Sequence, residues 1–150
     1  MVRELEPADI PDCERVLYGL PDWFGLPESN RAYIEALSRF PGAVAQIDGR
    51  IVGFVALEEH DPRSVELHVI AVQQDRHRQG TGTALVEWAE DWCRGRGVRW
   101  FHVKTRGPST PDPEYDRTRQ FYLARGFEPL FETLELWGPE NAALILVKRL

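Results

Sequence analysis

Cysteine is scarce in this chain of 150 residues, which contains only Cys13 and Cys93. Their wide separation gives no metal-binding or redox spacing, so we expect two buried free thiols. The sequence also lacks an apolar run long enough to cross a membrane, a signal-peptide pattern after Met1, a repeat and a low-complexity tract. These absences predict a soluble, cytoplasmic protein with no membrane partner and no bound metal.

Basic residues are fewer than acidic ones: the chain has 18 Lys and Arg against 24 Asp and Glu, and its net charge is −6. An acidic surface repels phosphate backbones, which argues against a nucleic-acid partner, and it attracts cationic amines. Apolar residues are plentiful at 43%, with five Trp and seven Phe. This composition is enough for a substantial core and predicts one compact domain over residues 1–150.

The order of the predicted elements is that of a mixed α/β fold. The dipeptide Asp48-Gly49 is typical of a two-residue hairpin turn and is expected to connect two of the strands. A Pro-rich loop over 107–113 precedes the last helix. We expect a central, mostly antiparallel sheet of about six or seven strands, with about four helices distributed over both faces. The predicted strands are 2–6, 43–47, 50–57, 64–72, 98–105, 128–131 and 143–148. The first predicted helix is capped by 7–9 and runs to about 20, and the second is opened by 27–30 and runs to about 40. The third follows the glycine turn, has apolar residues from 84 to 92 on one stripe and is ended by Gly95 and Gly97, and the fourth covers 116–125.

A glycine-containing turn between the 64–72 strand and the helix after it is the most informative segment. Gly80 and Gly82 allow a tight turn and a close approach of the main chain to a ligand. The helix that begins there presents unpaired N–H groups at the positive end of its dipole, and Arg76 and Arg78 add cationic donors. The turn therefore predicts an anion site. Its spacing matches neither a P-loop nor a dinucleotide fingerprint.

The pattern His77-x-x-Gly80-x-Gly82 resembles the pyrophosphate motif of the Gcn5-related N-acetyltransferase (GNAT) superfamily, Gln/Arg-x-x-Gly-x-Gly/Ala, with His in the first place. About forty residues later, 121–127 resemble the same family's late helix motif, Phe-Tyr-x-x-x-Gly-Phe. Tyr115 and Thr118 stand where the family often has Asn and Ala. The resemblance covers essentially the whole chain, and it implies the GNAT fold.

The resemblance implies acetyl-CoA as cosubstrate and direct transfer of its acetyl group to a primary amine of a small molecule or peptide. It places the pantetheine arm on the main chain of the bulged strand before the turn and against Phe121. The residues implied in cofactor binding are thus Ile70, Ala71, Val72, His77, Arg78, Gln79, Gly80, Thr81, Gly82, Thr83 and Phe121.

The chemistry requires a neutral amine and a proton for the departing thiolate. Glu66 and His68 lie two apart on one strand and point to the same face, so either is a candidate base, acting directly or through water. The resemblance favours Glu66, and it implies that Tyr122 is the general acid. Glu66 could instead be an ion-pair partner, His68 a packing residue and Tyr122 a core aromatic. We interpret His102 as structural and His60 as a loop residue.

Two other functions remain open at this stage. One is a non-catalytic acyl-CoA-binding regulatory module, and the other is a site for a plain nucleotide. Acceptor choice is expected in the variable parts: Trp23, Phe24, Glu28, the turn 58–61 and the Pro-rich loop with Tyr115. The tail 136–141 and the segment 23–28 resemble a bacterial subgroup of the family, and Trp137 would suit the face of a homodimer.

Overall fold

The computed structural model describes residues 1–150, which build one seven-stranded sheet in the order β1-β2-β3-β4-β5-β7-β6. All neighbouring strands are antiparallel except β4 and β5, which are parallel. The strands are β1 Val2–Glu4, β2 Gly42–Ile47, β3 Arg50–Asp61, β4 Ser64–Val72, β5 Trp100–Arg106, β6 Glu128–Thr133 and β7 Ala143–Arg149. The predicted mixed, mostly antiparallel sheet is therefore confirmed.

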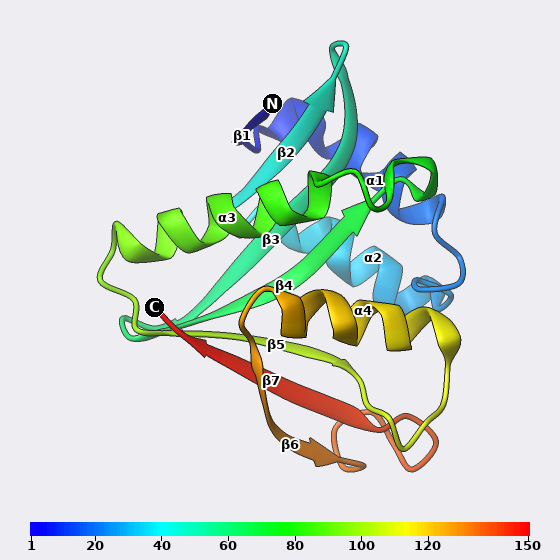
Figure 1. Cartoon of the computed structure of the whole chain (residues 1–150). Helices are drawn as coiled ribbons and strands as arrows, with labels where there is room; N and C mark the ends of the chain where they lie inside the picture. The colour runs from blue at the N-terminus through cyan, green and yellow to red at the C-terminus, as the bar shows by residue number, and fades with distance from the viewer.

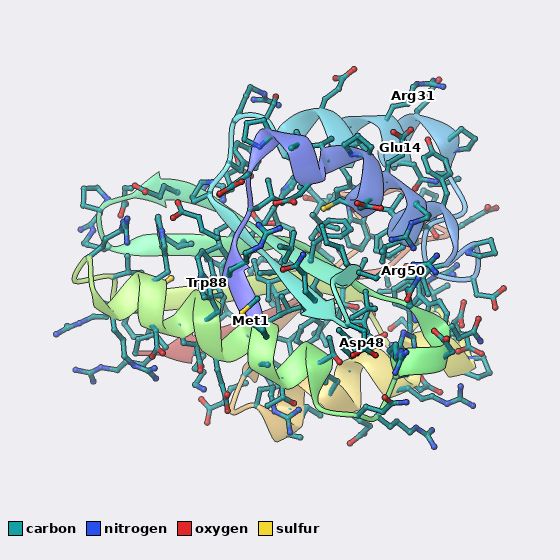
Figure 2. All side chains as sticks on the ribbon, turned by 90° about the horizontal axis from the view of Figure 1, so that it is seen from above. Met1, Glu14, Arg31, Asp48, Arg50 and Trp88 are labelled. Atoms are coloured by element: carbon teal, nitrogen blue, oxygen red, sulfur yellow. The ribbon has the colours of Figure 1, made fainter.

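Helices cover both faces of the sheet, as expected. α1 and α2 pack on one face and α3 and α4 on the other (Figures 1 and 2). Proline stands in the first turn of α1, α2 and α4, where its missing N–H costs no hydrogen bond. The helices are α1 Ile10–Tyr18, α2 Pro27–Ala36, α3 Thr81–Arg94 and α4 Pro113–Ala124, with short 3₁₀ turns η1 Pro7–Asp9 and η2 Gln74–Arg76.

Two apolar layers hold the helices to the sheet. On one face, Leu85 and Ala89 of α3 pack with Val55, Leu57 and other strand residues, all nearly inaccessible to solvent. On the other face, Val16 and Leu17 of α1 pack against Phe54 and the end of β4, and Cys13 is buried in this layer. Cys93 lies in the first layer, so both cysteines are buried free thiols, as expected.

The hairpin between β2 and β3 has the predicted turn chemistry. Asp48 and Gly49 both have positive φ, 52° and 75°, which is the requirement of a two-residue hairpin turn that matches strand twist. This turn fixes the register in which β2 pairs with β3.

β4 contains a bulge that separates it from β5. Ala56 of β3 pairs with Val69 and Leu57 pairs with Leu67, so His68 is the extra residue. β4 pairs with β5 only over residues 64–67, opposite residues 100–103. Beyond Leu67 the strands diverge, β4 toward the start of α3 and β5 toward the loop that precedes α4 (Figure 1). The main chain of the second half of β4 is thus unpaired on its β5 side.

Several predicted boundaries were wrong, and the three largest differences are of three or four residues. α4 begins at Pro113, within the expected loop, because the Asp112 side chain accepts a hydrogen bond from the Glu114 N–H at 3.0 Å and caps the helix. β3 continues to Asp61 because it pairs with β4 to the end, so His60 lies in a strand and not in a loop. α2 ends at Ala36, earlier than expected.

The edge strand β6 carries apolar side chains into solvent. Leu130 and Phe131 are more than half exposed, and Trp137 in the following segment is 43% exposed. The homodimer suggested by Trp137 stays a prediction. No helix in the structure is long and apolar enough to span a membrane.

Candidate functional site

The glycine turn, residues 77–83, presents a row of unpaired main-chain donors. The first hydrogen bond of α3 runs from the Ala84 N–H to the Gly80 carbonyl, so the N–H groups of Thr81, Gly82 and Thr83 have no partner within the helix. Arg78 and Gly80 have positive φ, 63° and 84°, which turns neighbouring N–H groups in one direction. This geometry suits an anion with several oxygens.

Three side chains of the turn already have hydrogen-bond partners within the protein. His77 Nε2 lies 2.7 Å from the Val72 carbonyl, and the ring contacts Trp23 edge-on. Gln79 Nε2 donates to the Asp75 carbonyl at 3.0 Å. The Thr83 hydroxyl accepts from Arg125 at 2.7 Å. Contacts of these residues with an anion would therefore come chiefly from the main chain.

Gly82 lets the turn pack closely against α4. A Cβ atom at this position would lie 3.2 Å from two ring atoms of Phe121. The absence of a side chain lets the first turn of α3 rest directly on the Phe121 ring, and Arg125 covers that ring at 5.0 Å from its centroid. The two sequence motifs, predicted separately, thus meet in space. Arg125, which sequence reasoning assigned no role, supplies a cation beside the start of α3.

Ile70, Ala71 and Val72 lie on the diverging half of β4, where the strand has no partner on its β5 side. This placement agrees with the expectation that their main chain is available to a ligand. Val72 is followed directly by Gln73 and η2, so an extended molecule along β4 leads into the glycine turn. A site for a long ligand with an anionic end is therefore built by continuous main chain.

Tyr122 is 4% exposed and packs edge-on against Phe121 and Phe127. Its hydroxyl makes no hydrogen bond within the protein. Burial raises the pKa of this phenol well above its ordinary value, and Tyr115 and Tyr33 add to the effect. The residue stays protonated at physiological pH and keeps a free donor.

Aromatic groups from three elements gather near Tyr122. Tyr33 of α2 lies edge-on to His68, and the Tyr115 hydroxyl donates to the Trp23 carbonyl at 2.7 Å, which ties α4 to the loop after α1. Burial lowers the pKa of His68, so its ring is neutral at pH 7. His68 also contacts Phe40 and lies 3.5 Å from Glu58, which agrees with its interpretation as a packing residue.

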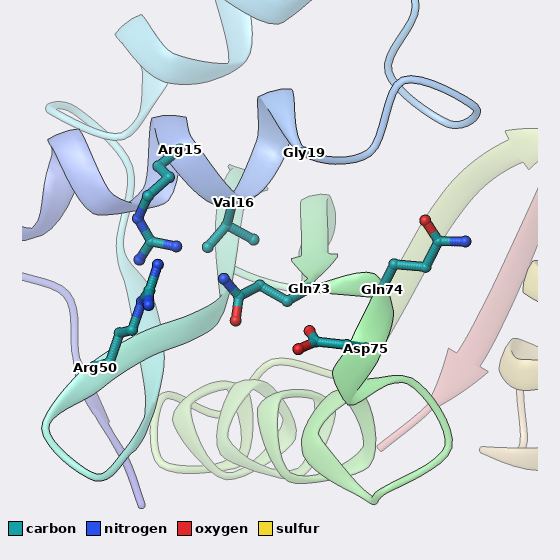
Figure 3. A pocket seen from close by; sticks show the side chains of 7 residues that line it. All are labelled: Arg15, Val16, Gly19, Arg50, Gln73, Gln74 and Asp75. Carbon is teal, nitrogen blue, oxygen red and sulfur yellow. The ribbon is translucent and has the colours of Figure 1, made fainter.

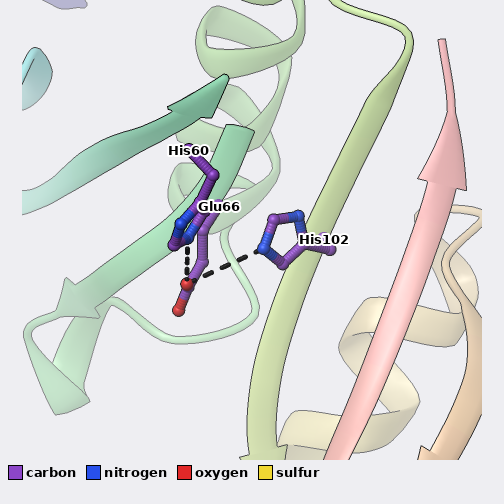
Figure 4. Close-up of side chains that lie close together, drawn as sticks. All are labelled: His60, Glu66 and His102. Atoms are coloured by element: carbon purple, nitrogen blue, oxygen red, sulfur yellow. Dashed lines mark hydrogen bonds and ion pairs between the residues drawn. The ribbon is translucent and has the colours of Figure 1, made fainter. Parts of the chain in front are cut away.

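Glu66 is the centre of a charged network on the same face of the sheet. Its Oε1 lies 2.8 Å from His60 Nε2 and 3.7 Å from His102 Nε2 (Figure 4). Lys104 Nζ lies 3.0 Å from the same oxygen. Burial alone would raise the pKa of Glu66, but the contacts from His102, His60 and Lys104 hold it at about 2. The carboxylate is therefore ionised at neutral pH and is a weak base.

The second oxygen of Glu66 is free. All three contacts of the carboxylate fall on Oε1, and Oε2 has no hydrogen-bond partner in the protein. Sequence reasoning gave Lys104 no role, because nothing in a single sequence shows that residues 38 positions apart face each other across two parallel strands.

A polar depression of about 420 Å³ lies beside the glycine turn, between α1, the start of β3 and η2 (Figure 3). It contains none of the residues predicted for catalysis. Its lining residues are Arg15, Val16, Gly19, Arg50, Gln73, Gln74 and Asp75. The candidate site is therefore placed at the divergence of β4 and β5, where the donors and the phenol lie.

Comparison with known sequences gives one family. Residues 10–127 match the model of the acetyltransferase (GNAT) family. An L-2,4-diaminobutyric acid acetyltransferase of Nocardia farcinica is 39% identical over 87 residues, which are 55% of this chain and 45% of that protein. An uncharacterized N-acetyltransferase of Methanocaldococcus jannaschii is 33% identical over 95 residues, 57% of this chain and 38% of that protein. The chain thus spans less than half the length of either relative.

Solved structures share the fold at low sequence identity. A GNAT-family protein from Desulfovibrio desulfuricans superposes with a TM-score of 0.85 at 21% identity, over 99% of this chain and 98% of that one. An aminoglycoside 6'-N-acetyltransferase in complex with coenzyme A gives a TM-score of 0.80 at 16% identity, over 99% and 96%. At these identities the likeness establishes the fold alone.

The network around Glu66 predicts a pH-dependent stability. Because the folded pKa, about 2, is below the ordinary 4.5, the stabilisation is complete above pH 4.5 and is lost as the pH falls toward 2. Lowering the pH from 6 to 3 should therefore reduce the free energy of unfolding of the wild type by about 2 kcal/mol through this group. Urea unfolding of Glu66→Gln should lack this part of the loss, and the exposed control Glu128→Gln should retain it. An equal loss in Glu66→Gln and wild type would contradict the network.

Proposed function

Because the chain belongs to the GNAT family of acetyltransferases, we propose that it transfers an acetyl group from acetyl-CoA directly to a primary amine of a small molecule or peptide. The observation that carries the proposal is the contact between Gly82 and Phe121. It brings the turn with its unpaired donors next to the helix that carries Tyr122, a buried phenol with a free hydroxyl.

The glycine turn is the proposed site of the diphosphate of coenzyme A. The N–H groups of residues 78–83 supply the donors, and Arg78 and Arg125 supply positive charge. The pantetheine amides are proposed to pair with the main chain of residues 70–72, where β5 has diverged. The arm then passes Phe121 and ends near Tyr122.

Tyr122 is proposed to protonate the leaving sulfur. As the amine nitrogen attacks the thioester carbonyl carbon, the C–S bond breaks and negative charge develops on sulfur. The buried phenol holds its proton at all physiological pH and has no competing acceptor, so it can donate to that sulfur. Burial also disfavours the phenolate, so the phenol regains a proton before the next cycle.

Glu66 is proposed to hold the acceptor ammonium and to receive its proton through Oε2, directly or through water. A carboxylate with a pKa of about 2 keeps a proton only briefly. His60, which contacts Oε1 and whose side chain is 43% exposed, offers a path from Glu66 to solvent. His68, neutral and half-buried, is the second candidate for this step.

The acceptor is proposed to be a cationic amine held among aromatic rings. Tyr33 and Tyr115 lie near Tyr122, and Glu66 adds negative charge near Tyr33. Aromatic faces and a carboxylate together favour an ammonium group. Relatives named for diaminobutyric acid and aminoglycosides indicate that amine substrates are common among similar proteins.

The alternative is an acyl-CoA-binding regulatory module without catalysis, and the acceptor side of the site argues against it. A module that only binds acyl-CoA needs the glycine turn but not a buried phenol with a free donor and a carboxylate with a free oxygen.

Incubation of the purified protein with acetyl-CoA and a panel of diamines, amino acids, aminoglycosides and peptides should release free CoA with at least one cationic amine. Colorimetric titration of the new thiol measures this release. Acetyl-CoA binding by calorimetry, combined with no thiol release across the panel, would favour the regulatory module.

Tyr122→Phe should lower kcat by more than tenfold and leave the KM for acetyl-CoA within about twofold, because it removes only the proton donor. Tyr18→Phe, on the exposed side of α1, is the matched control and should behave as wild type. Undiminished turnover in Tyr122→Phe would remove this residue from the acid role.

Gly82→Asp should weaken CoA binding by at least tenfold, because the side chain crowds Phe121 and puts negative charge beside the N–H groups. Gly95→Asp, at the other end of α3, is the control. Thermal unfolding with and without CoA reports the affinity, and ATP in place of CoA tests a plain nucleotide site. Equal protection of Gly82→Asp and wild type by CoA would mean that the diphosphate binds elsewhere.

A further inference from the structure

We propose that His60, Glu66 and His102 form a binding site for a Zn²⁺ ion, and that zinc bound there inhibits acetyl transfer. The three residues come from β3, β4 and β5 and lie on one face of the sheet (Figure 4). Their separations in sequence do not form a metal motif, which is why a single sequence predicts none. The inhibitory part of the proposal rests on the proposed function, and the binding part does not.

The donor atoms converge closely enough for one ion. Glu66 Oε1 lies 2.8 Å from His60 Nε2 and 3.7 Å from His102 Nε2, and all three atoms lie within 4.8 Å of one another. Two ligands of a tetrahedral zinc, each about 2.1 Å from it, are about 3.4 Å apart. Side-chain movements of about 1 Å would therefore bring the three donor atoms to these distances. Two imidazoles and one carboxylate are a ligand set that zinc accepts.

The surroundings of His102 fix its ring. Ser64 Oγ lies 3.3 Å from His102 Nδ1, on the side of the ring away from Glu66. When Nδ1 donates to the hydroxyl, Nε2 has a lone pair that a metal ion can take up. A hydrogen bond at the far nitrogen is the usual support of a metal-binding histidine.

Without a metal, Lys104 is the cation that pairs with the carboxylate, at 3.0 Å from Oε1. Its side chain is 32% exposed and flexible, so its ammonium can move into solvent when a metal arrives. Zinc and Lys104 are therefore competitors for one oxygen. This competition predicts that loss of the lysine charge tightens zinc binding, which a merely structural cluster would not do.

Zinc at this site would oppose the binding of a cationic acceptor. The carboxylate contributes one negative charge to the approach of the amine, and a divalent ion on Oε1 changes the local charge from −1 to +1. His60 would lose its contact with solvent protons as it coordinates the metal. Inhibition should accordingly be competitive with the amine and should leave binding of acetyl-CoA unchanged.

Titration of the protein with zinc chloride alone, by calorimetry in a buffer that does not bind zinc, tests the site directly. We expect one ion per chain with micromolar or tighter affinity. His60→Ala and His102→Ala should each weaken it by more than tenfold, and Lys104→Met should strengthen it by more than threefold.

His68→Asn is the matched control, because His68 also lies beside a carboxylate, Glu58, at 3.5 Å but outside the cluster. Its affinity for zinc should equal that of wild type. His60 is partly exposed, so His60→Ala should fold normally, and circular dichroism of each variant verifies this. Absence of binding at 100-fold excess zinc, or binding that His60→Ala and His102→Ala leave intact, would overturn the site.

The inhibitory role is tested separately, with the best amine of the acceptor panel. Zinc should raise the KM for that amine at least tenfold in wild type and have little effect on His60→Ala. Zinc that binds through the cluster but leaves turnover unchanged would overturn the inhibitory role. A protein that acetylates no amine at all would refute the proposed function, and the calorimetric titration would still decide the metal site.

Discussion

Direct contact between the first turn of α3 and the Phe121 ring is the constraint on which the rest of the site depends. A Cβ atom at Gly82 would crowd the ring, and the N–H groups in this first turn have no partner within the helix. Unpaired donors at a helix N-terminus are costly unless a ligand or water satisfies them. The packing that joins α3 to α4 therefore also prepares the turn for an anion.

The divergence of β4 from β5 likewise leaves main-chain groups unpaired, and these groups are available to a ligand. The bulge at His68 ends the parallel pairing and leaves the second half of β4 with free main-chain groups. The paired half below it brings Glu66 beside His102, with Lys104 also within reach, which balances a carboxylate that would otherwise be expensive to bury. One strand thus supplies a recognition edge at one end and a charged centre at the other.

Sequence reasoning was most successful where a local pattern determines a local structure. Asp48-Gly49, the glycine turn and the alternation of elements led to the fold, and the GNAT family assignment is confirmed. It was least successful where contacts depend on the register of distant strands. His60 was interpreted as a loop residue, and Lys104 and Arg125 had no predicted role. Neighbouring residues do not determine which residues of two parallel strands lie opposite each other, or where two helices cross. Main-chain contacts of the kind proposed for residues 70–72 leave no side-chain signal at all.

A crystal structure of the protein in complex with coenzyme A tests the central claim most directly. The account predicts that the diphosphate oxygens lie within hydrogen-bond distance of the N–H groups of residues 78–83, with the pantetheine arm along residues 70–72 and its sulfur near Tyr122. A diphosphate bound elsewhere, or an arm that does not follow β4, would contradict it.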